Sequence, residues 1–286
     1  MPDPAIAVLP YGGRMGRAMG DKPVSELKWP LGCPERLLGK RVRDLSPSDH
    51  LIVFPKTEMH FQLNWHCPAQ VSMMVVEPKV IHGHHLHLLR LTHKRFFRVF
   101  SYDRDFLSRV PNGIFLPFGT SWVPNWRELN INKTAEVSLI ASGKRDHVGH
   151  KLRHELVEFV RAERLDVAVL GRGFTPFEEK SEGLAPYRYS VVIENVQQAN
   201  FFSEKLIDAI VCECVPIYWG CPNIAEFMDT SGMVICNDEA ELREAIRSAN
   251  PKDYLRRLPA LRAIKEVAAG FADLETRAAQ ALFDSL

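Results

Sequence analysis

The sequence has almost no net charge, and this excludes several classes of partner. Its 286 residues contain 36 Lys and Arg against 35 Asp and Glu, which gives a formal charge of +1. A chain so balanced has no overall field to hold a polyanion or an anionic membrane, so nucleic acid is not expected as the main partner. Apolar residues make up 46% and charged residues 25%, values typical of globular proteins, and disordered or fibrous classes are therefore excluded.

Cysteines and long apolar runs are also scarce. The six cysteines are too few for a disulfide scaffold in a chain of this length, and no C-x-x-C pair occurs. Cys212 and Cys214 alternate with Glu213, a pattern that indicates buried thiols. No run of 18 apolar residues is present, and the N-terminus lacks the basic start and cleavage site of a signal peptide. We therefore expect a cytoplasmic location and no transmembrane segment.

Short apolar runs bounded by Gly, Pro or Asp alternate with amphipathic stretches along the whole chain. These runs cover residues 5–12, 50–55, 71–77, 96–102, 113–119, 135–143, 166–173, 189–195, 215–220 and 233–238. Continuous apolar runs with helices between them predict parallel strands covered on both faces. We predict an α/β protein of two facing, doubly wound domains, residues 1–133 and 134–286. The second ends in helices that Pro251 and Pro259 interrupt.

Ligands of open α/β sheets bind at the carboxyl ends of the strands, so the loops there carry the functional candidates. One predicted strand ends at Glu194 and Asn195, and the helix after it begins at Ser203, Glu204 and Lys205. Ser203 is a predicted N-cap, and Glu204 complements the helix dipole. A lysine in the first turn is disfavoured unless an anion lies beside it, so Lys205 and the helix amides predict a diphosphate site. A helix that is merely well capped is the alternative.

The stretch around this helix resembles a known signature. Residues 187–227, YRYSVVIENVQQANFFSEKLIDAIVCECVPIYWGCPNIAEF, are similar to the donor-binding region of glycosyltransferase family 10, the α-1,3/4-fucosyltransferases. That region reads approximately Y-x-F-x-(apolar)-x-E-N, a short loop, Y-V-T-E-K, an apolar helix and (V/I)-P-I-Y-W-G-x-P. Weaker similarity covers residues 137–159, and VVEP at 75–78 resembles the turn that carries the family's proposed base.

The resemblance implies a GT-B fold, two facing Rossmann-like domains in which the C-terminal one binds GDP-fucose. It implies an inverting transfer of fucose to a hydroxyl of a glycan acceptor. Lys205 and Arg153 would face the diphosphate, with Lys144 and Arg145 as rivals of Arg153, and Glu204 would accept hydrogen bonds from the ribose. Fixed cations and helix amides can stabilise the leaving diphosphate without a metal, so no metal or other cofactor is expected and the GDP-sugar is a substrate.

The remaining donor-binding candidates come from the same resemblance. Glu194 and Asn195 would shape the strand end beside the sugar or ribose. Phe201 replaces the family's tyrosine, so it can stack on a base or ribose but cannot donate a hydrogen bond. Ser203 replaces threonine and keeps the cap.

An inverting transfer needs one carboxylate that takes the proton of the acceptor hydroxyl. Glu77 follows a predicted strand and precedes Pro78, so it is the candidate, and Glu58 is the alternative. Asp103 and Asp105 form a D-x-D sequence, a motif that binds metal in other transferases. We predict instead that Asp103 is the N-cap of a helix and that Asp105 lies in its first turn.

All 11 histidines lie between residues 50 and 154, and five of them fall within residues 82–93. His82 and His84, or His85 and His87, would share one face of a strand, which makes a zinc site one interpretation. Because no H-E-x-x-H spacing accompanies them, we favour an acceptor-binding loop that contains His82, His84 and His85.

Two other functions stay open at this point. The same scaffold can use another nucleotide sugar, because the residues of the signature recognise the phosphates and the ribose more specifically than the hexose. A non-catalytic protein that binds a nucleotide sugar or glycan would keep Glu204 and Lys205 but needs no base. The acceptor, the linkage and the oligomeric state do not follow from the sequence.

Overall fold

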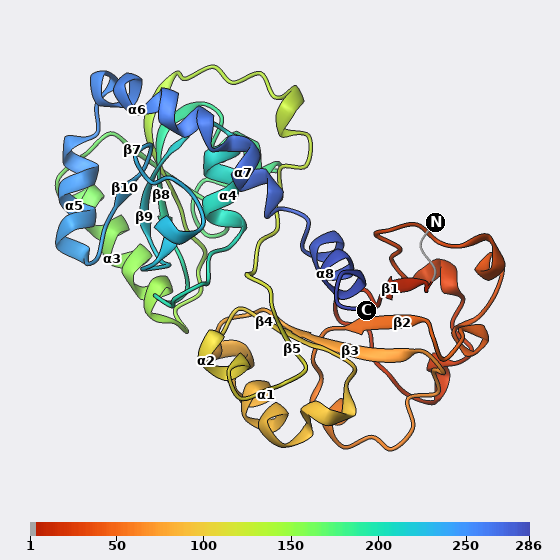
Figure 1. The fold of residues 1–286 in the computed structure, drawn as a ribbon. Coiled ribbons are helices and arrows are strands. Elements are labelled where there is room, and N and C mark those ends of the chain that lie inside the picture. The colour runs from red at the N-terminus through yellow and green to blue at the C-terminus, as the bar shows by residue number, and fades with distance from the viewer. Residues whose placement is uncertain (1–3) are drawn as a thin grey trace. The chain divides into compact units, whose positions relative to one another are not determined.

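The computed structural model describes residues 4–286, and it divides the chain into two compact units (Figure 1). The first runs to Pro117 and includes Leu274–Leu286, and the second is Phe118–Asp273. Each contains one sheet of five strands, and every strand pair is parallel. The predicted pair of Rossmann-like sheets is therefore present.

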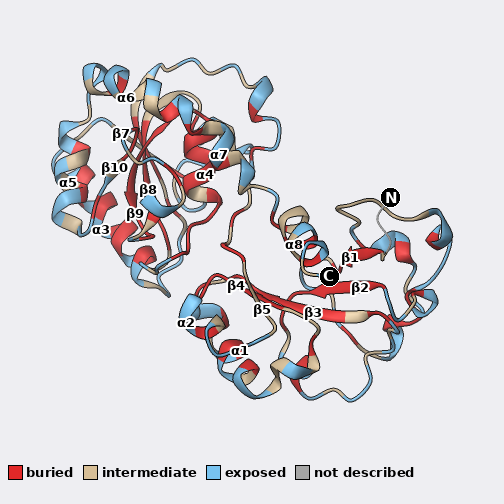
Figure 2. Ribbon diagram, in the orientation of Figure 1, coloured by how far each residue is buried: buried red, intermediate tan, exposed pale blue. Residues whose placement is uncertain are grey.

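The sheet of the first unit has the strand order β1-β2-β3-β4-β5. Its strands are Ile6–Val8, His50–Val53, Gln70–Val75, Val99–Ser101 and Gly113–Phe115. The helices of this unit are α1 (Lys79–Thr92), α2 (Arg104–Leu107) and α8 (Leu274–Phe283). Most of β1 to β4 is buried, as Figure 2 shows.

The sheet of the second unit has the order β10-β9-β8-β6-β7. Its strands β6 to β10 are Ala135–Ile140, Val167–Leu170, Tyr187–Ile193, Val215–Trp219 and Val234–Ile235. Its helices α3 to α7 are Val148–Ala162, Glu204–Val211, Glu239–Ser248, Pro251–Ala263 and Lys265–Gly270. After β7 the chain returns to the other side of β6, so the strand order reverses between β6 and β8. Such a switch point is where ligands of open α/β sheets bind.

The boundary between the units differs from the predicted one near residue 133. It lies at Pro117 and Phe118, because the loop before β6 packs on the second unit. Ser121 Oγ and the Trp122 N–H donate to the Asp208 carboxylate of α4, at 2.7 and 3.1 Å. The C-terminal helix α8 returns to the first unit, although we assigned the tail to the second. Low apolar density marked the loop, but composition does not show which core a loop joins.

Of the two prolines predicted to interrupt the C-terminal helices, only Pro251 does so. It is the first residue of α6, and Asn250 caps this helix by accepting from the Asp253 N–H at 3.0 Å. Pro259, by contrast, lies inside α6. Proline leaves the carbonyl four residues earlier, that of Leu255, without its helical donor. Both residues are exposed, so water can satisfy this carbonyl.

The histidine-rich segment is helical, whereas we expected a strand face or a loop. It forms α1, the crossover between the parallel strands β3 and β4. Such a crossover needs a dozen or more residues and is usually a helix, which decides the structure of this segment. At helical spacing His82 and His85 are buried, while His84 and His87 are exposed.

Candidate functional site

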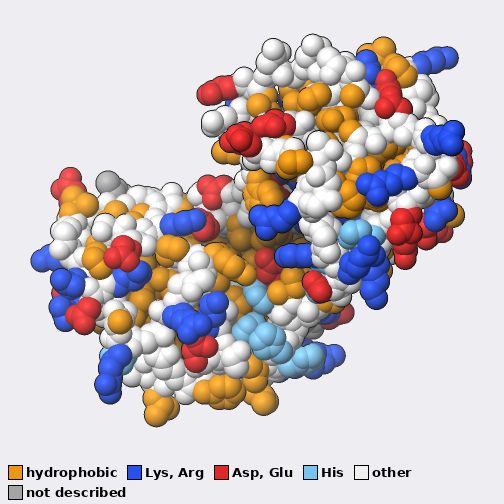
Figure 3. All heavy atoms as spheres, turned by 180° about the vertical axis from the view of Figure 1, so that it is seen from behind, with side chains coloured by type: hydrophobic (Ala, Val, Ile, Leu, Met, Phe, Trp, Pro, Cys, Tyr) orange, Lys and Arg blue, Asp and Glu red, His pale blue; other side chains and the backbone are white. Residues whose placement is uncertain are grey.

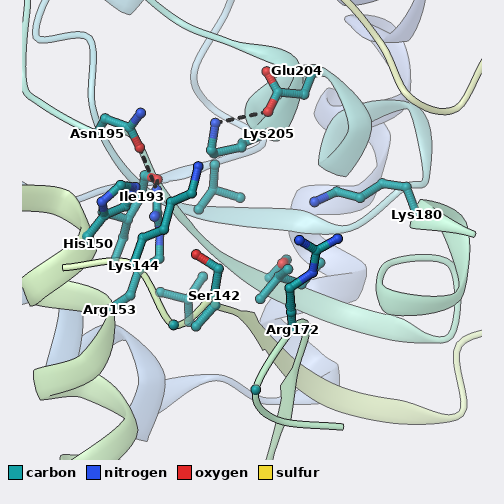
Figure 4. A pocket seen from close by; sticks show the side chains of 18 of the residues that line it. Ser142, Lys144, His150, Arg153, Arg172, Lys180, Ile193, Asn195, Glu204 and Lys205 are labelled. Carbon is teal, nitrogen blue, oxygen red and sulfur yellow. Dashed lines mark hydrogen bonds and ion pairs between the residues drawn. The ribbon is translucent and has the colours of Figure 1, made fainter. Parts of the chain in front are cut away.

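A pocket of about 1090 Å³ lies within the second unit, at the carboxyl ends of β6, β7 and β8. The loops after these strands and the first turn of α4 form its wall (Figure 4). Six cations line it against two carboxylates: Lys144, Arg145, Arg153, Arg172, Lys180 and Lys205 against Asp146 and Glu204. This excess of positive charge at a topological switch point suits an anionic ligand.

The start of α4 is held by a buried carboxylate. Ser203 is the N-cap, as predicted, and its Oγ accepts from the Lys205 N–H at 3.4 Å. The Ser203 N–H and Oγ in turn donate to the two carboxylate oxygens of Glu194, at 2.8 and 2.7 Å. Glu194 is 1% exposed, and burial raises its pKa. Glu194 and Ser203 therefore lie behind the pocket and position α4, and they do not line it as we expected of donor-binding residues.

Lys205 lines the pocket and is paired with carboxylates. Its Nζ lies 2.9 Å from Glu204 Oε1, 3.1 Å from Ser203 Oγ and 3.8 Å from Glu194 Oε2. Burial lowers the pKa of Lys205, but the two carboxylates outweigh this effect and the pKa is raised overall. The side chain is therefore a stable ammonium. The anion that we predicted beside this lysine is supplied here by the protein's own glutamates.

Glu204 is the carboxylate of this network that reaches the pocket. The residue is 8% exposed, and burial alone would raise its pKa. The positive charges of Lys205 and Lys180 reverse this effect, so the pKa of Glu204 is lowered. Glu204 is thus an ionised group that can accept hydrogen bonds from a ligand's hydroxyls.

Arg153 and Asn195 complete one side of the pocket. Arg153 extends from α3 and donates to the carbonyl of Ile193 at the end of β8, with Asn195 Oδ1 at 3.5 Å. It is 6% exposed, and burial lowers the pKa of its guanidinium, while Glu194 and Glu204 oppose this. The rivals Lys144 and Arg145 line the same pocket.

Two further cations, Arg172 and Lys180, line the pocket but were not predicted from the sequence. Figure 4 shows them on the side of the pocket opposite Arg153 and Lys144. Arg172 follows β7 within two residues, so the rule on strand ends would have found it. Lys180 begins the short 3₁₀ helix Lys180–Gly183, for which the sequence carried no signal. Burial lowers the pKa of Lys180, and the charges of Asp208 and Glu204 oppose this.

Phe201 does not reach the pocket either. It is 3% exposed, and its ring stacks on Phe118 with centroids 5.7 Å apart and planes inclined by 9°. The seven donor-binding candidates therefore separate into two groups. Four line the pocket, namely Arg153, Asn195, Glu204 and Lys205, and three lie behind it, namely Glu194, Phe201 and Ser203.

The candidate bases lie at the carboxyl edge of the first unit's sheet. Glu77 follows β3 and directly precedes the helix α1. Burial raises the pKa of Tyr11, in the loop after β1, and the negative charge of Glu77 raises it further. Glu58 is exposed on the 3₁₀ helix Thr57–His60, which follows β2.

His60 and two histidines of α1, His82 and His85, form a buried cluster. His60 Nε2 lies 3.0 Å from His85 Nδ1, and His60 Nδ1 lies 2.9 Å from Thr92 Oγ1. Burial lowers the pKa of His60 and His82 to about 4 and that of His85 to about 3. Of the three histidines that we placed in an acceptor loop, only His84 is exposed.

The structural role predicted for Asp103 can be compared directly with the structure, and three other features hold for the described residues. Asp103 caps α2 by accepting from the Phe106 N–H at 3.2 Å, and it pairs with Lys79 at 2.7 Å, which confirms its predicted structural role. No group of three or more His, Cys, Asp or Glu side chains in residues 4–286 is arranged to hold a metal ion. All six cysteines are free thiols. Within the same residues, every helix is too short or too polar to cross a bilayer.

Gly149 joins α3 to the strand end beside the pocket, and its substitution should be costly. Its N–H donates to the Asn195 carbonyl at 3.0 Å, and a Cβ at this position would lie 1.8 Å from the Glu194 carbonyl oxygen. We expect Gly149→Ala to lower the free energy of unfolding by about 1–3 kcal/mol, because backbone must move to admit the methyl group. The control is Gly143→Ala, since no atom lies within 4 Å of that Cβ. Urea unfolding of both variants measures the difference, and equal stabilities would contradict the expectation.

Part of this chain is similar in sequence to a known protein, although no family profile matches it. Over 81 residues it is 33% identical to an α-(1,3)-fucosyltransferase of Helicobacter pylori. The predicted resemblance to the fucosyltransferases is confirmed. The match spans 28% of this chain but only 16% of that relative's length.

Solved structures show the fold more completely. A crystal structure of an α1,3-fucosyltransferase with GDP-fucose has a TM-score of 0.51 and 16% identity, covering 82% of this chain and 81% of that one. A UDP-forming α,α-trehalose-phosphate synthase from Burkholderia xenovorans has a TM-score of 0.54 and 11% identity, covering 84% and 74%. Sequence identities this low show only that the fold is shared, and they confirm the predicted GT-B class.

Proposed function

We propose that this protein is an inverting glycosyltransferase that moves fucose from GDP-fucose to a hydroxyl of a glycan acceptor. The observation that carries the proposal is the cationic pocket at the switch point, where Lys205, Arg153 and Glu204 meet. The 81-residue match to an α-(1,3)-fucosyltransferase supports the choice of fucose. A protein of the same fold has been crystallised with GDP-fucose, which supports the choice of GDP as the carrier.

In this proposal the second unit binds the donor. Lys205, Arg153 and the first amides of α4 hold the diphosphate, and Lys205 exchanges part of its contact with Glu204 for the phosphate oxygens. Glu204 is then available to accept hydrogen bonds from the ribose hydroxyls. Because these cations are fixed before the reaction begins, they stabilise the charge that develops on the leaving diphosphate.

The first unit supplies the base. The acceptor hydroxyl attacks the anomeric carbon from the face opposite the diphosphate, and a new carbon–oxygen bond forms. The bond to the diphosphate breaks, and its electron pair leaves with GDP. Glu77 takes the hydroxyl proton, and the configuration at the anomeric carbon is inverted.

A panel of nucleotide sugars tests this function. We expect hydrolysis or transfer with GDP-fucose and little with other nucleotide sugars, measured by release of the nucleoside diphosphate. Preference for another donor would replace fucose by that sugar on the same scaffold. GDP binding without turnover of any donor and acceptor would favour a non-catalytic binding protein instead.

Removal of metal tests the source of charge stabilisation. If the protein's own cations neutralise the leaving diphosphate, transfer should survive saturating EDTA, with modest stimulation at most by added Mn²⁺. Initial rates before and after chelation give the answer. Complete loss that metal restores would contradict the proposal and turn attention back to the histidines of α1.

A further inference from the structure

The first unit carries a concentration of positive charge that the proposed function does not use. Between Glu58 and Asp103 the only carboxylate is Glu77. Five cations fall in the same stretch: Lys79, Arg90, Lys94, Arg95 and Arg98. Five cations minus one carboxylate give +4, or +3 when Lys79 is counted with its ion-pair partner Asp103, whereas the whole chain has a formal charge of +1. Residues 59–102 are therefore a basic segment, although the net charge of the whole chain is close to zero.

Exposed apolar side chains lie in the same segment. Phe61, Leu63 and Leu91 are 62%, 97% and 87% exposed. Leu91 is in the last turn of α1, and the other two follow the 3₁₀ helix that packs on α1. The hydrogen bond from His60 to Thr92 joins the two segments directly beside these residues. Figure 3 shows hydrophobic side chains gathered on the lower edge of this unit, where Figure 1 places α1.

A basic pocket of about 760 Å³ lies at the amino ends of β3 and β4. Arg95, which lines it, donates to the carbonyl of Gln62, between Phe61 and Leu63. Trp65 and Phe96 form one wall, stacked with ring centroids 5.4 Å apart. Four basic residues line the pocket and no carboxylate does: His93, Lys94, Arg95 and Arg98. Arg98 donates to Ser285, so the exposed Lys94 is the cation best placed to meet a ligand.

We propose that Phe61, Leu63 and Leu91, with the exposed cations Arg90 and Lys94, form a docking surface for the anionic face of a lipid bilayer. Apolar side chains enter the interface, and neighbouring cations meet the phosphates, which is how peripheral proteins bind such membranes. A soluble anion would account for the basic pocket but not for two almost fully exposed leucines. A second copy of this chain would bring two sets of cations together, so charge complementarity favours the bilayer.

Vesicle sedimentation tests the docking surface with the whole chain. The protein should sediment with vesicles of phosphatidylcholine containing about a third phosphatidylglycerol, and not with pure phosphatidylcholine. Binding should be largely lost at ~0.5 M salt, where charges are screened beyond about 4 Å. The double variants Leu63→Ser/Leu91→Ser and Arg90→Glu/Lys94→Glu should each weaken partitioning about tenfold or more.

Matched controls come from α6 of the second unit. Leu255 is 64% exposed there and Lys252 is exposed, so Leu255→Ser and Lys252→Glu should leave partitioning unchanged. Absence of binding to the anionic vesicles, or equal losses in the control variants, would overturn the proposal. Competition by soluble glycerol phosphate would reveal a site for free anions instead. A dimer that dissociates in Leu63→Ser/Leu91→Ser, seen by analytical ultracentrifugation, would identify a second copy as the occupant.

Discussion

Replacing Glu77 by glutamine is expected to lower turnover by about 10²–10⁴-fold, the usual effect of losing a general acid or base. The amide keeps the size and the hydrogen-bonding head of the carboxylate but cannot accept the acceptor's proton. GDP affinity should stay near that of the wild type, because Glu77 belongs to the first unit and the donor pocket lies within the second. Initial transfer rates and calorimetry with GDP measure the two effects separately.

Glu58→Gln is the matched control for this variant. It makes the same chemical change at the same edge of the sheet, and it should leave turnover close to that of the wild type. The low-pH limb of the rate profile should vanish in Glu77→Gln, since that limb would report the ionisation of this carboxylate. Retained turnover in Glu77→Gln would move the role of base to Glu58 or to a histidine of α1.

Replacing Lys205 by alanine is expected to weaken GDP binding by about 10- to 100-fold, or roughly 1.5–3 kcal/mol, the scale of a charge-assisted hydrogen bond. The loss has two parts. The diphosphate loses a cation, and Glu204 loses the ammonium 2.9 Å away that offsets its negative charge beside the ligand. Calorimetric titration of GDP measures the change.

Two further variants make this result specific. Arg153→Ala should also weaken GDP binding, because Arg153 lines the same pocket. Lys151→Ala removes an exposed cation of α3 that does not line the pocket, and it should change GDP affinity by less than about twofold. Urea unfolding shows whether each variant is still folded. Unchanged GDP affinity in a folded Lys205→Ala protein would refute the site.

The sequence predicted a structural element correctly where the residues that determine it lie close together in the chain. The apolar runs between Gly, Pro and Asp predicted the strands of both sheets. Ser203 was recognised as a cap because its hydroxyl meets amides only two residues away. Asp103 was assigned to a helix start for the same reason, and the structure agrees.

Prediction failed where the outcome depends on distant partners. The segment that became α1 contains four histidines and a glycine, residues without a strong helix preference, and the crossover between β3 and β4 imposes the helix. The loop before β6 joins the second unit through Asp208, which lies far along the chain. Glu194 looked like a ligand-binding residue, but its carboxylate turns inward to Ser203.

The sequence by itself therefore determined the α/β class, the parallel strands, the capped start of α4 and the resemblance that singles out Glu204 and Lys205. These features rest on residue types and spacings within a few turns of chain. Only the tertiary structure decided which candidates line the pocket, and that Arg172 and Lys180 join them. Burial and charge pairing depend on contacts between side chains that are distant in the sequence, and residue spacing does not predict such contacts.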